Sequence, residues 1–523
     1  MKRKLWTLLL ALGAALALCA GASAKTEEND FYVALKATDG SIKLENDFVF
    51  ENVMEVNYDL TIDLNGYVLT IPKSICVNSG AHLTIKDSNS NAPHKFKPNS
   101  DGLWVLDETN GTEIVTGGVI TGGTGTQWDQ YYRGGVYVAP GGTLTMESGS
   151  IVGCSANGNG LSLGGGVYID SSANSNAGTF TMNGGSIIGC TADGGGGVLV
   201  ALECHFTMNT GAVIRSCTAQ MGGGVYCLGM SGSSGMFTLN GGTIQSCKAL
   251  GRGGGGVSNS GEFLMQNGSI KGCTSEKDSN KSDGILNSGQ FTMSGGTVED
   301  NVTNSTINAD GGTVTGAVTN GIHNGPGKIT GTSEDSGKTE FANTVINHSN
   351  STLSGFGKFT GHVTNNGGKI TGFCTFTGTV TNNGGKIIGF CDFKEATLIG
   401  YLIVTFDPDN GEQSFTRQVP WCKDGAALTE PSPAPTKDGY SFDGWYKGYG
   451  WDKWDFDTNK VSYTMTLTAK WTENPPAPSY DDSDPTYAVS APVAENGKIA
   501  VSPKNASAGS TVTITVKPDS GYV

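Results

Sequence analysis

The segment Thr179-Phe-Thr-Met-Asn-Gly-Gly-Ser-Ile-Ile-Gly-Cys190, followed by Gly194-Gly-Gly-Gly-Val-Leu-Val200, contains the pattern that decides the fold. It combines a Phe-Thr-Met phrase, an apolar residue three places before a cysteine, and a glycine cluster that runs into Val-Tyr or an equivalent. These phrases recur in the same order six times between residues 133 and 301, with Asn301 in place of the last cysteine. The Phe-type positions are Leu144, Phe180, Phe206, Phe237, Phe263 and Phe291.

Each phrase has the signature of a short β-strand, because β-branched and aromatic residues are bounded by Gly, Asn or Ser. Phe180 and Met182 can face one side of a strand while Thr181 faces the other. The Phe-type positions are 36, 26, 31, 26 and 28 residues apart, a spacing typical of a solenoid or a propeller. A propeller blade needs four strands in about 40 residues, whereas these units offer three in about 30. The sequence therefore predicts an all-β protein built on a right-handed parallel β-helix with three sheets.

We expect this β-helix to occupy residues 25–400, with strands from about Phe31 to Tyr401, and the five phenylalanines to stack in one interior column. Residues 361–377 and 378–394 are two 17-residue units that are identical at 13 positions. Ile370, Cys374 and Phe376 share one parity and are expected to line the core. The segments Asn365-Asn366-Gly367-Gly368 and Asn382-Asn383-Gly384-Gly385 are expected to form corners. Paired asparagines could alternatively mark a ligand site.

The cysteines recur once per repeat, which predicts a stacked column and not a disulfide framework. The column members are Cys154, Cys190, Cys217, Cys247 and Cys273. Their direction is open, because Cys154 lies three places after the core residue Ile151. A bend after Gly153 would return the sulfur to the core, and without a bend the sulfur would face out. We expect the five thiols to be mostly reduced and buried.

Residues 1–24 read as a secretory signal peptide, with Lys2-Arg3-Lys4, an apolar run from Leu8 to Leu18, and Ala22-Ser23-Ala24 before the cleavage point. Its removal takes away three positive charges and changes the formal net charge from −15 to −18. We expect no other segment to span a bilayer. A strongly acidic chain is a poor partner for nucleic acid and anionic membrane surfaces. An extracellular or cell-envelope location is therefore predicted.

The residues of the repeats give little support for a catalytic function. The acids between residues 134 and 272 are Glu147, Asp170, Asp193, Glu203 and Glu262, and none recurs at one repeat position. A polysaccharide lyase or glycoside hydrolase needs carboxylates that converge on adjacent turns. Asp59 and Asp63 lie near an early turn and read as strand and turn residues.

Glu203-Cys204-His205 is a compact nucleophile-like cluster, but neighbours in a strand point to opposite faces. The other histidines lack metal-ligand spacing. We therefore predict no catalytic residue, no metal site and no cofactor. A polysaccharide lyase or glycoside hydrolase of the β-helix class remains the alternative.

The Gly-Gly-Val-Tyr and Phe-Thr-Met-Asn phrases resemble the GGA[ILV]/FxxN repeats of polymorphic outer-membrane proteins. FxxN is matched at Phe180/Asn183, Phe206/Asn209 and Phe237/Asn240, and is broken where Glu147, Gln266 and Ser294 replace the asparagine. The resemblance implies a β-helical surface protein and supports the fold more than any activity.

Residues 401–472 have a different composition, with more proline and tryptophan. Pro435-Thr-Lys-Asp-Gly-Tyr-Ser-Phe-Asp-Gly-Trp-Tyr446 and Leu467-Thr-Ala-Lys-Trp471 resemble the internalin B-repeat, also called the Listeria–Bacteroides repeat. The resemblance implies a small β-grasp-like module of bacterial surface proteins. Tyr449 and Trp451 lie in a loop that departs from the family. They are candidates for stacking on sugars, and the alternative is that the module's aromatic residues form its core.

Residues 473–487 form a Pro/Asp/Ser linker, and residues 488–523 resemble a truncated, sandwich-type bacterial surface repeat. Taken together, the chain is predicted to be a non-enzymatic secreted or cell-surface protein with an adhesin-like stalk. Its expected partners are host or microbial surface glycans or proteins.

Overall fold

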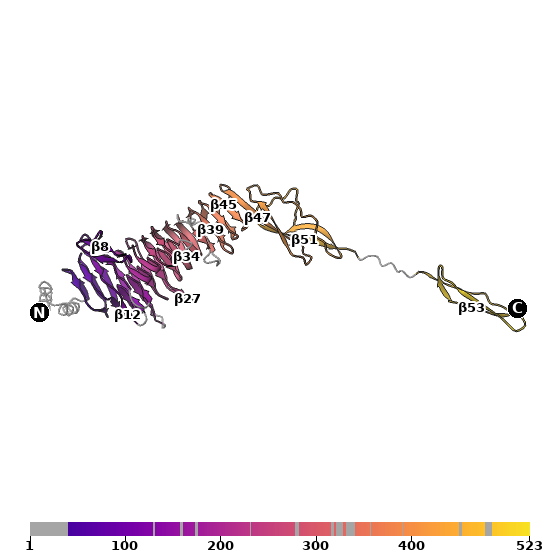
Figure 1. The fold of residues 1–523 in the computed structure, drawn as a ribbon, viewed down its shortest axis with the longest axis horizontal. Coiled ribbons are helices and arrows are strands. Elements are labelled where there is room, and N and C mark those ends of the chain that lie inside the picture. The colour runs from indigo at the N-terminus through magenta and orange to yellow at the C-terminus, as the bar shows by residue number, and fades with distance from the viewer. Residues whose placement is uncertain are drawn as a thin grey trace, which may run out of the picture. The chain divides into compact units, whose positions relative to one another are not determined.

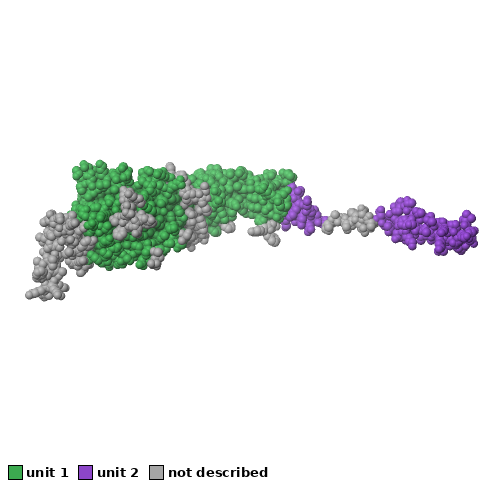
Figure 2. Space-filling view, turned by 60° about the horizontal axis from the view of Figure 1, so that its bottom comes forward, with its two compact units in different colours: residues 1–433, 445–469 green, residues 434–444, 470–523 purple. Residues whose placement is uncertain are grey.

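The computed structural model describes residues 40–128, 131–156, 161–172, 176–230, 232–277, 282–314, 318–320, 328–330, 340–355, 357–389, 391–448, 452–475 and 484–523. The chain divides into two compact units, residues 1–433 with 445–469 and residues 434–444 with 470–523 (Figure 2). No α-helix occurs in these ranges. The predicted signal peptide, residues 476–483 of the predicted linker, and the candidates Tyr449 and Trp451 lie outside the described residues.

The first unit is a parallel β-helix whose strands stack as successive rungs (Figure 1). Three parallel ladders run through it, as the sequence predicts. The first ladder consists of β1 (Ser41–Lys43), β4 (Leu60–Asp63), β7 (His82–Lys86), β15 (Thr143–Met146), β19 (Thr179–Met182), β23 (His205–Met208), β29 (Met236–Gln245), β32 (Glu262–Lys271), β34 (Ile285–Val298), β35 (Val302–Val314), β37 (Lys328–Thr330), β40 (Thr352–Ser354), β43 (Lys369–Gly372) and β46 (Lys386–Gly389).

The second ladder shares the long strands β29, β32, β34 and β35 with the first, because these strands turn a corner without interruption. Its other members are β2 (Phe48–Val49), β5 (Val68–Thr70), β11 (Val119–Thr121), β16 (Ser150–Val152), β20 (Ser186–Ile188), β24 (Val213–Arg215), β38 (Glu340–Phe341), β41 (Lys358–Phe359) and β44 (Thr375–Phe376).

The third ladder closes each turn and shares β34 and β35. Its other members are β3 (Met54–Val56), β6 (Ile75–Val77), β14 (Val136–Val138), β18 (Val167–Ile169), β22 (Val198–Val200), β26 (Val225–Cys227), β31 (Val257–Asn259), β36 (Val318–Asn320), β39 (Val345–Asn347), β42 (Val363–Asn365), β45 (Thr379–Asn383) and β47 (Thr397–Asp407).

The central turns carry a fourth parallel ladder that the three-sheet prediction did not include. It begins at β12 (Thr126–Trp128), which pairs antiparallel with the next member, and it lies between the second and third ladders along the chain. Its other members are β13 (Tyr131–Arg133), β17 (Leu161–Leu163), β21 (Thr191–Gly194), β25 (Thr218–Met221), β30 (Lys248–Ala249) and β33 (Thr274–Ser275). From β17 onward, the sequence after each column cysteine forms this ladder.

The predicted phenylalanine column is confirmed. Phe180, Phe206, Phe237, Phe263 and Phe291 pair in register along the first ladder and are almost fully buried. Successive ring centroids lie 4.8–5.0 Å apart with interplanar angles of 6–12°. Such ring pairs stabilise a core by about 0.5–1.5 kcal/mol each beyond their buried area.

The open question of the cysteine direction is resolved by a bend. The residue before each column cysteine has a positive φ, between 54° and 62°, at Gly153, Gly189, Ser216, Ser246 and Gly272. This left-handed residue turns the chain so that the following thiol points inward. All five cysteines are buried and free.

A three-stranded antiparallel flap, β8 (Pro93–Pro98), β9 (Trp104–Leu106) and β10 (Glu113–Thr116), is inserted between β7 and β11. It covers the outer side of the second ladder through a cluster that includes Phe96, Trp104 and Val152. At Gly153 a Cβ atom would lie 1.6 Å from the Trp104 carbonyl oxygen. Where the flap covers the coil, the position before the column cysteine must therefore be glycine. On later turns, Ser216 and Ser246 occupy the equivalent position.

A ladder of asparagines runs through the core and was not predicted. One interior position of the third ladder is occupied by Val200 and then by Cys227 on successive rungs. On the next seven rungs the same position is occupied by asparagine, and each of these asparagines is no more than 1% exposed. Each amide donates to the next side-chain oxygen at 2.7–3.2 Å. The members are Asn259, Asn287, Asn304, Asn320, Asn347, Asn365 and Asn382.

The predicted Asn-Asn corners are therefore corrected in part. Asn365 and Asn382 point into the core, and only their neighbours Asn366 and Asn383 lie at the surface, where Asn383 donates to Asn366 at 2.9 Å. Asn382 ends the inner ladder by donating to the Tyr401 carbonyl oxygen at 2.6 Å. A buried amide is stable there because its donors and acceptor are used.

Strand β47 belongs to both the coil and the following module. Its first half pairs parallel with β45, and its second half pairs antiparallel with β48 (Phe415–Pro420) and parallel with β51 (Met465–Glu473). A short antiparallel pair, Tyr446↔Lys453 and Lys447↔Asp452, joins β49 (Tyr440–Lys447) to β50 (Asp452–Lys453). One strand thus continues the ladder hydrogen bonds of the coil into the module (Figure 1).

In the second unit, β52 (Thr486–Ala488) pairs antiparallel with β54 (Asn505–Ser507), and β53 (Gly497–Ser502) with β55 (Thr513–Pro518). The pairs Ile499↔Val516 and Val501↔Ile514 place four β-branched residues on one face of the two-stranded β53–β55 sheet. A further short hairpin, in the first unit, joins β27 (Gly229–Met230) to β28 (Ser233–Ser234).

We predict that Asn365→Asp destabilises the coil by at least about 1–3 kcal/mol at neutral pH, because the ionised carboxylate cannot donate to Asn382 and would be a buried charge. Burial favours its neutral form and raises its folded-state pKa above the unfolded value of about 3.9. The loss should therefore be smallest below pH 4 and grow as the pH rises. Denaturant unfolding across this range measures it.

Asn366→Asp is the matched control. Its side chain lies at the surface and needs only to accept from Asn383, so its effect should stay within about 0.5 kcal/mol. Equal effects of the two substitutions would contradict a stabilising role of the inner ladder.

Candidate functional site

A groove lies between the fourth ladder and the outer side of the third, with a volume of about 650 Å³. One wall is formed by the fourth ladder, with Leu161, Leu163, Asp193, Gly194, Gln220 and Met221. The other wall is formed by Tyr168, Asp170, Ser171, Ala201, Leu202, Tyr226 and Leu228. We call this hollow the ladder groove. Its volume suits a small ligand or part of a longer one.

Asp170 lies at the centre of a polar cluster beside the ladder groove. Its carboxylate accepts hydrogen bonds from the Arg133 guanidinium at 3.1 Å, the Tyr137 hydroxyl at 2.9 Å and the Tyr168 hydroxyl at 3.2 Å. Arg133 is buried and stacks over the Tyr137 ring at 4.0 Å. Burial and the nearby Asp170 carboxylate raise the pKa of Tyr168. These contacts hold the groove wall in one arrangement.

Asp193 supplies the second carboxylate of the ladder groove. It accepts a hydrogen bond from the Ser162 amide at 3.0 Å, which orients it on the fourth ladder. Leu161 and Met221 lie at the surface with 51% and 40% exposure. The groove thus combines exposed apolar surface with carboxylate and amide oxygens that can accept hydrogen bonds.

The structure separates the residues of the Glu203-Cys204-His205 cluster. Cys204 is buried and His205 is exposed, as the strand parity predicts. Glu203 has a φ of 63° and accepts from the Ser233 hydroxyl. Glu203, His205 and Glu262 instead line an open pocket of about 470 Å³ with the β27–β28 hairpin. Glu262 lies two rungs beyond His205 in register, so the sequence did not reveal this neighbourhood.

Asp63 has a turn role, as predicted. It is buried and accepts from the amides of Asn65 and Ser88 at 3.1 Å and 2.9 Å. Across the described residues, no group of three or more His, Cys, Asp or Glu side chains is arranged to hold a metal ion.

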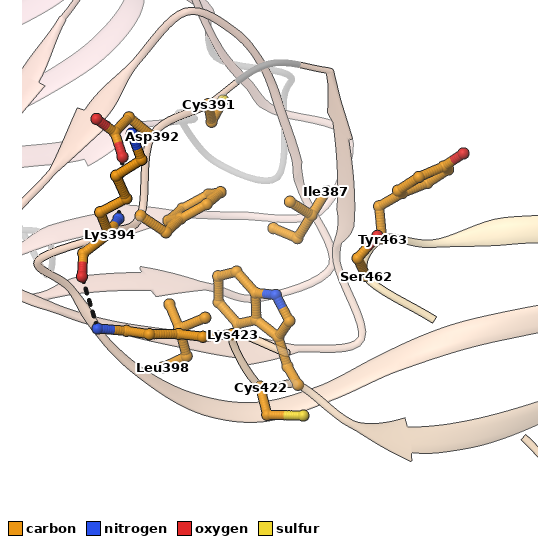
Figure 3. A pocket seen from close by; sticks show the side chains of 11 residues that line it. Ile387, Cys391, Asp392, Lys394, Leu398, Cys422, Lys423, Ser462 and Tyr463 are labelled. Carbon is orange, nitrogen blue, oxygen red and sulfur yellow. Dashed lines mark hydrogen bonds between the residues drawn. The ribbon is translucent and has the colours of Figure 1, made fainter. Parts of the chain in front are cut away.

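A third hollow, the junction pocket, lies where the coil meets the module and measures about 440 Å³ (Figure 3). Trp421 packs edge-on against Phe393 with centroids 5.2 Å apart. The Lys423 ammonium donates to the Lys394 carbonyl oxygen at 2.7 Å. The remaining walls are formed by Ile387, Cys391, Asp392, Leu398, Cys422, Ser462 and Tyr463.

The cysteine column has a different environment from the junction pocket. Cys154, Cys190, Cys217 and Cys247 are fully enclosed. For Cys190, Cys217 and Cys247, burial is the main cause that raises the thiol pKa, and for Cys154 it is the hydrogen bond with Cys190, followed by burial. A neutral, enclosed thiol is a poor nucleophile. The column therefore serves packing.

The ladder groove was missed because the fourth ladder was missed. A signal was present, since Cys190-Thr-Ala, Cys217-Thr-Ala, Cys247-Lys-Ala and Cys273-Thr-Ser recur after the second strand of each turn. These residues pair in register as β21, β25, β30 and β33.

The fold and its surface hollows define a parallel β-helix repeat protein that carries a C-terminal repeat module. Residues 403–470 match the Listeria-Bacteroides repeat domain, which supports the module predicted from the sequence. No solved structure matches the chain. The resemblance to polymorphic outer-membrane proteins stays a prediction.

Two relatives illustrate the similarity. A segment of 117 residues is 35% identical to a "Putative Gly-rich membrane protein" of Evansella cellulosilytica, covering 22% of this chain. A segment of 72 residues is 43% identical to "Internalin H" of Listeria monocytogenes, covering 13% of this chain. The matched segments span 12% of the length of each relative. Neither name is that of an enzyme. Within the described part of this chain, no helix is long and apolar enough to cross a membrane.

We predict that the five column thiols react little with a thiol reagent such as 5,5′-dithiobis(2-nitrobenzoate) in the native protein and fully in denaturant. Enclosure removes access, and the raised pKa values of the first four keep those thiols protonated at neutral pH. Cys422, which is exposed, serves as the internal reference for a reactive thiol. Disulfide pairing within the column, found by mass mapping, would contradict this expectation.

Proposed function

We propose that the chain is a non-enzymatic protein of the bacterial cell surface, with an adhesin-like role in which a rigid coil presents binding surfaces. The observation that carries this proposal is the continuous succession of paired parallel strands from β1 to β47, so that the ladder groove and the module lie on one hydrogen-bonded scaffold. The match to the Listeria-Bacteroides repeat domain and the names of the relatives support a cell-envelope location.

The ladder groove is the proposed binding site, and a glycan is the proposed ligand class. The apolar face of a sugar ring packs on aromatic and aliphatic surface such as Tyr226 and Met221, and its hydroxyls donate to acceptors such as Asp193 and Gln220. Because the groove crosses several rungs at about 4.8 Å each, it offers repeated contacts to an extended chain.

The rival function is cleavage of a polysaccharide, and the pocket of Glu203, His205 and Glu262 is the observation that favours it. A general acid of this class needs a carboxyl whose pKa is raised by an apolar, enclosed setting. The Glu262 side chain is exposed to solvent, and Glu203 is engaged by Ser233. The pocket therefore supports binding better than acid–base chemistry.

We predict that the variant carrying Asp193→Asn and Met221→Ala binds its glycan at least tenfold more weakly than the unchanged chain, a loss of about 1.4 kcal/mol. Both side chains line the ladder groove, and neither holds the core together. Screening the mature chain on a glycan array, followed by affinity measurements on the strongest ligand, tests this. Glu299→Ala, an exposed acid outside the three hollows described above, is the control. Equal affinity of all three proteins would exclude the ladder groove as the site.

We also predict that the mature chain cleaves no polysaccharide. Incubation with pectins, mucin glycans and plant polysaccharides, with and without calcium, should release no new reducing or unsaturated ends. Turnover that disappears in Glu203→Gln or Glu262→Gln would overturn the non-enzymatic proposal and favour a β-helix hydrolase or lyase.

A further inference from the structure

The last two turns of the coil bring Cys374 and Cys391 onto neighbouring rungs. The Asp392 amide donates to the Cys374 carbonyl oxygen at 2.8 Å, and Thr375 pairs with Asp392 in an isolated parallel bridge. The Cys374 thiol donates to the Gly355 carbonyl oxygen at 3.6 Å, and the Cys391 thiol donates to the Gly372 carbonyl oxygen at 3.5 Å, so the two side chains occupy equivalent positions on successive rungs. Cys374 is enclosed, whereas Cys391 is half-buried and lines the junction pocket (Figure 3). One thiol of this pair thus has access to solvent and the other lies directly behind it.

The pair differs from the five-cysteine column in ways that bear on reactivity. Each inner column thiol lies between two further cysteines, and no column member is more than 3% exposed. The neighbouring Cys374 side chain lowers the pKa of Cys391, the less buried partner, whereas interaction with Cys391 and burial raise the pKa of Cys374. A thiolate with an adjacent second thiol is the arrangement that carries out thiol–disulfide exchange.

We propose that Cys391 and Cys374 form an exchange-active dithiol that reacts through the junction pocket with small-molecule disulfides. Cys391 is the attacking thiol because it lines the pocket, and Cys374 is the resolving thiol because it lies in register with Cys391 on the adjacent rung, inside the coil.

The exchange balances in two steps. The Cys391 thiolate attacks one sulfur of the small disulfide, forms a mixed disulfide and releases one thiolate. The Cys374 thiol then gives its proton to the first released thiolate and attacks the Cys391 sulfur. The second small thiolate leaves, takes up the proton that Cys391 had released on ionisation, and a Cys374–Cys391 disulfide remains. The protein dithiol is oxidised and the small disulfide is reduced to two thiols, so no further electron donor or acceptor is needed.

The junction pocket favours an anionic disulfide. Its volume of about 440 Å³ admits a small molecule, and Lys394 and Lys423 add two positive charges against the single carboxylate of Asp392. Trp421, Phe393 and Leu398 supply apolar surface on the remaining walls. Disulfides of small thiols that carry carboxylates fit this combination.

The product disulfide is sterically compatible with the coil. Neighbouring rungs lie about 4.8 Å apart, within the range of about 4.4–6.8 Å between the Cα atoms of a disulfide. Cys391 lies beyond the end of β46 on the final rung, where an isolated bridge replaces a ladder strand. Its backbone can therefore adjust more readily than that of a column cysteine, which is held between rungs on both sides. The new bond would join the last two turns next to β47.

The test uses the full chain with Cys422→Ser, which removes the exposed thiol that would also react. The protein is incubated with glutathione disulfide, quenched in acid, alkylated in denaturant and mapped by mass spectrometry. We expect loss of two hydrogens and a Cys374–Cys391 disulfide, formed at least tenfold faster than any modification of Cys190 or Cys217. Addition of Cys374→Ser should stop the reaction at a glutathione mixed disulfide on Cys391.

Addition of Cys391→Ser should leave Cys374 unmodified. Continued protection of the column thiols in each variant reports that the coil is folded, so a folding defect is distinguished from lost exchange. The proposal is overturned if Cys391 reacts no faster than the column thiols. It is equally overturned if the mixed disulfide on Cys391 persists while Cys374 is present, or if Cys374 reacts in the Cys391→Ser variant.

Discussion

The structure depends on hydrogen bonds between backbone strands that lie in parallel register, one rung above another. Because the rungs are about 4.8 Å apart, each strand residue that is paired in register lies directly over its counterpart one turn away. Like residues therefore meet like residues along the coil, and each column must consist of side chains that pack or bond with copies of themselves. Phenylalanine rings satisfy this by stacking, and thiols by their small, weakly polar surface.

The inner asparagine ladder shows that a polar column can replace an apolar one under the same constraint. Between the two ends of the ladder, each amide donates to one neighbour along the coil axis and accepts from the other, and several members donate further to a backbone carbonyl, as Asn259 does to Gln290. The first member, Asn259, retains a buried side-chain oxygen without a hydrogen-bond partner, because Cys227 precedes it in the column. The free-energy cost of a buried oxygen without a hydrogen bond arises only at this end. A long ladder therefore has more stabilising hydrogen bonds for the same cost than a short one.

The surface hollows occur where the regular stacking is interrupted. The ladder groove exists because the chain leaves the core after each cysteine and forms a fourth ladder. The pocket of Glu203 and Glu262 lies beside an inserted hairpin, and the junction pocket lies where the last rung passes into the module. Regular rungs form a rigid support, and the hollows proposed for ligand binding and thiol exchange lie where the regular stacking is interrupted.

The sequence by itself determined the strand phrases, the stacked phenylalanines and the presence of a repeat module, because periodicity and composition are local properties that stacking preserves. It left the cysteine direction open, since the left-handed residues at Gly153 and Ser216 that turn the thiols inward look like ordinary loop residues in the sequence. It placed Asn365 at a corner, because asparagine favours turns and is buried only where a neighbouring amide satisfies it. The fourth ladder, the neighbourhood of Glu203 and Glu262, and the access of Cys391 to a pocket were decided by the tertiary structure, because each depends on which turn lies beside which.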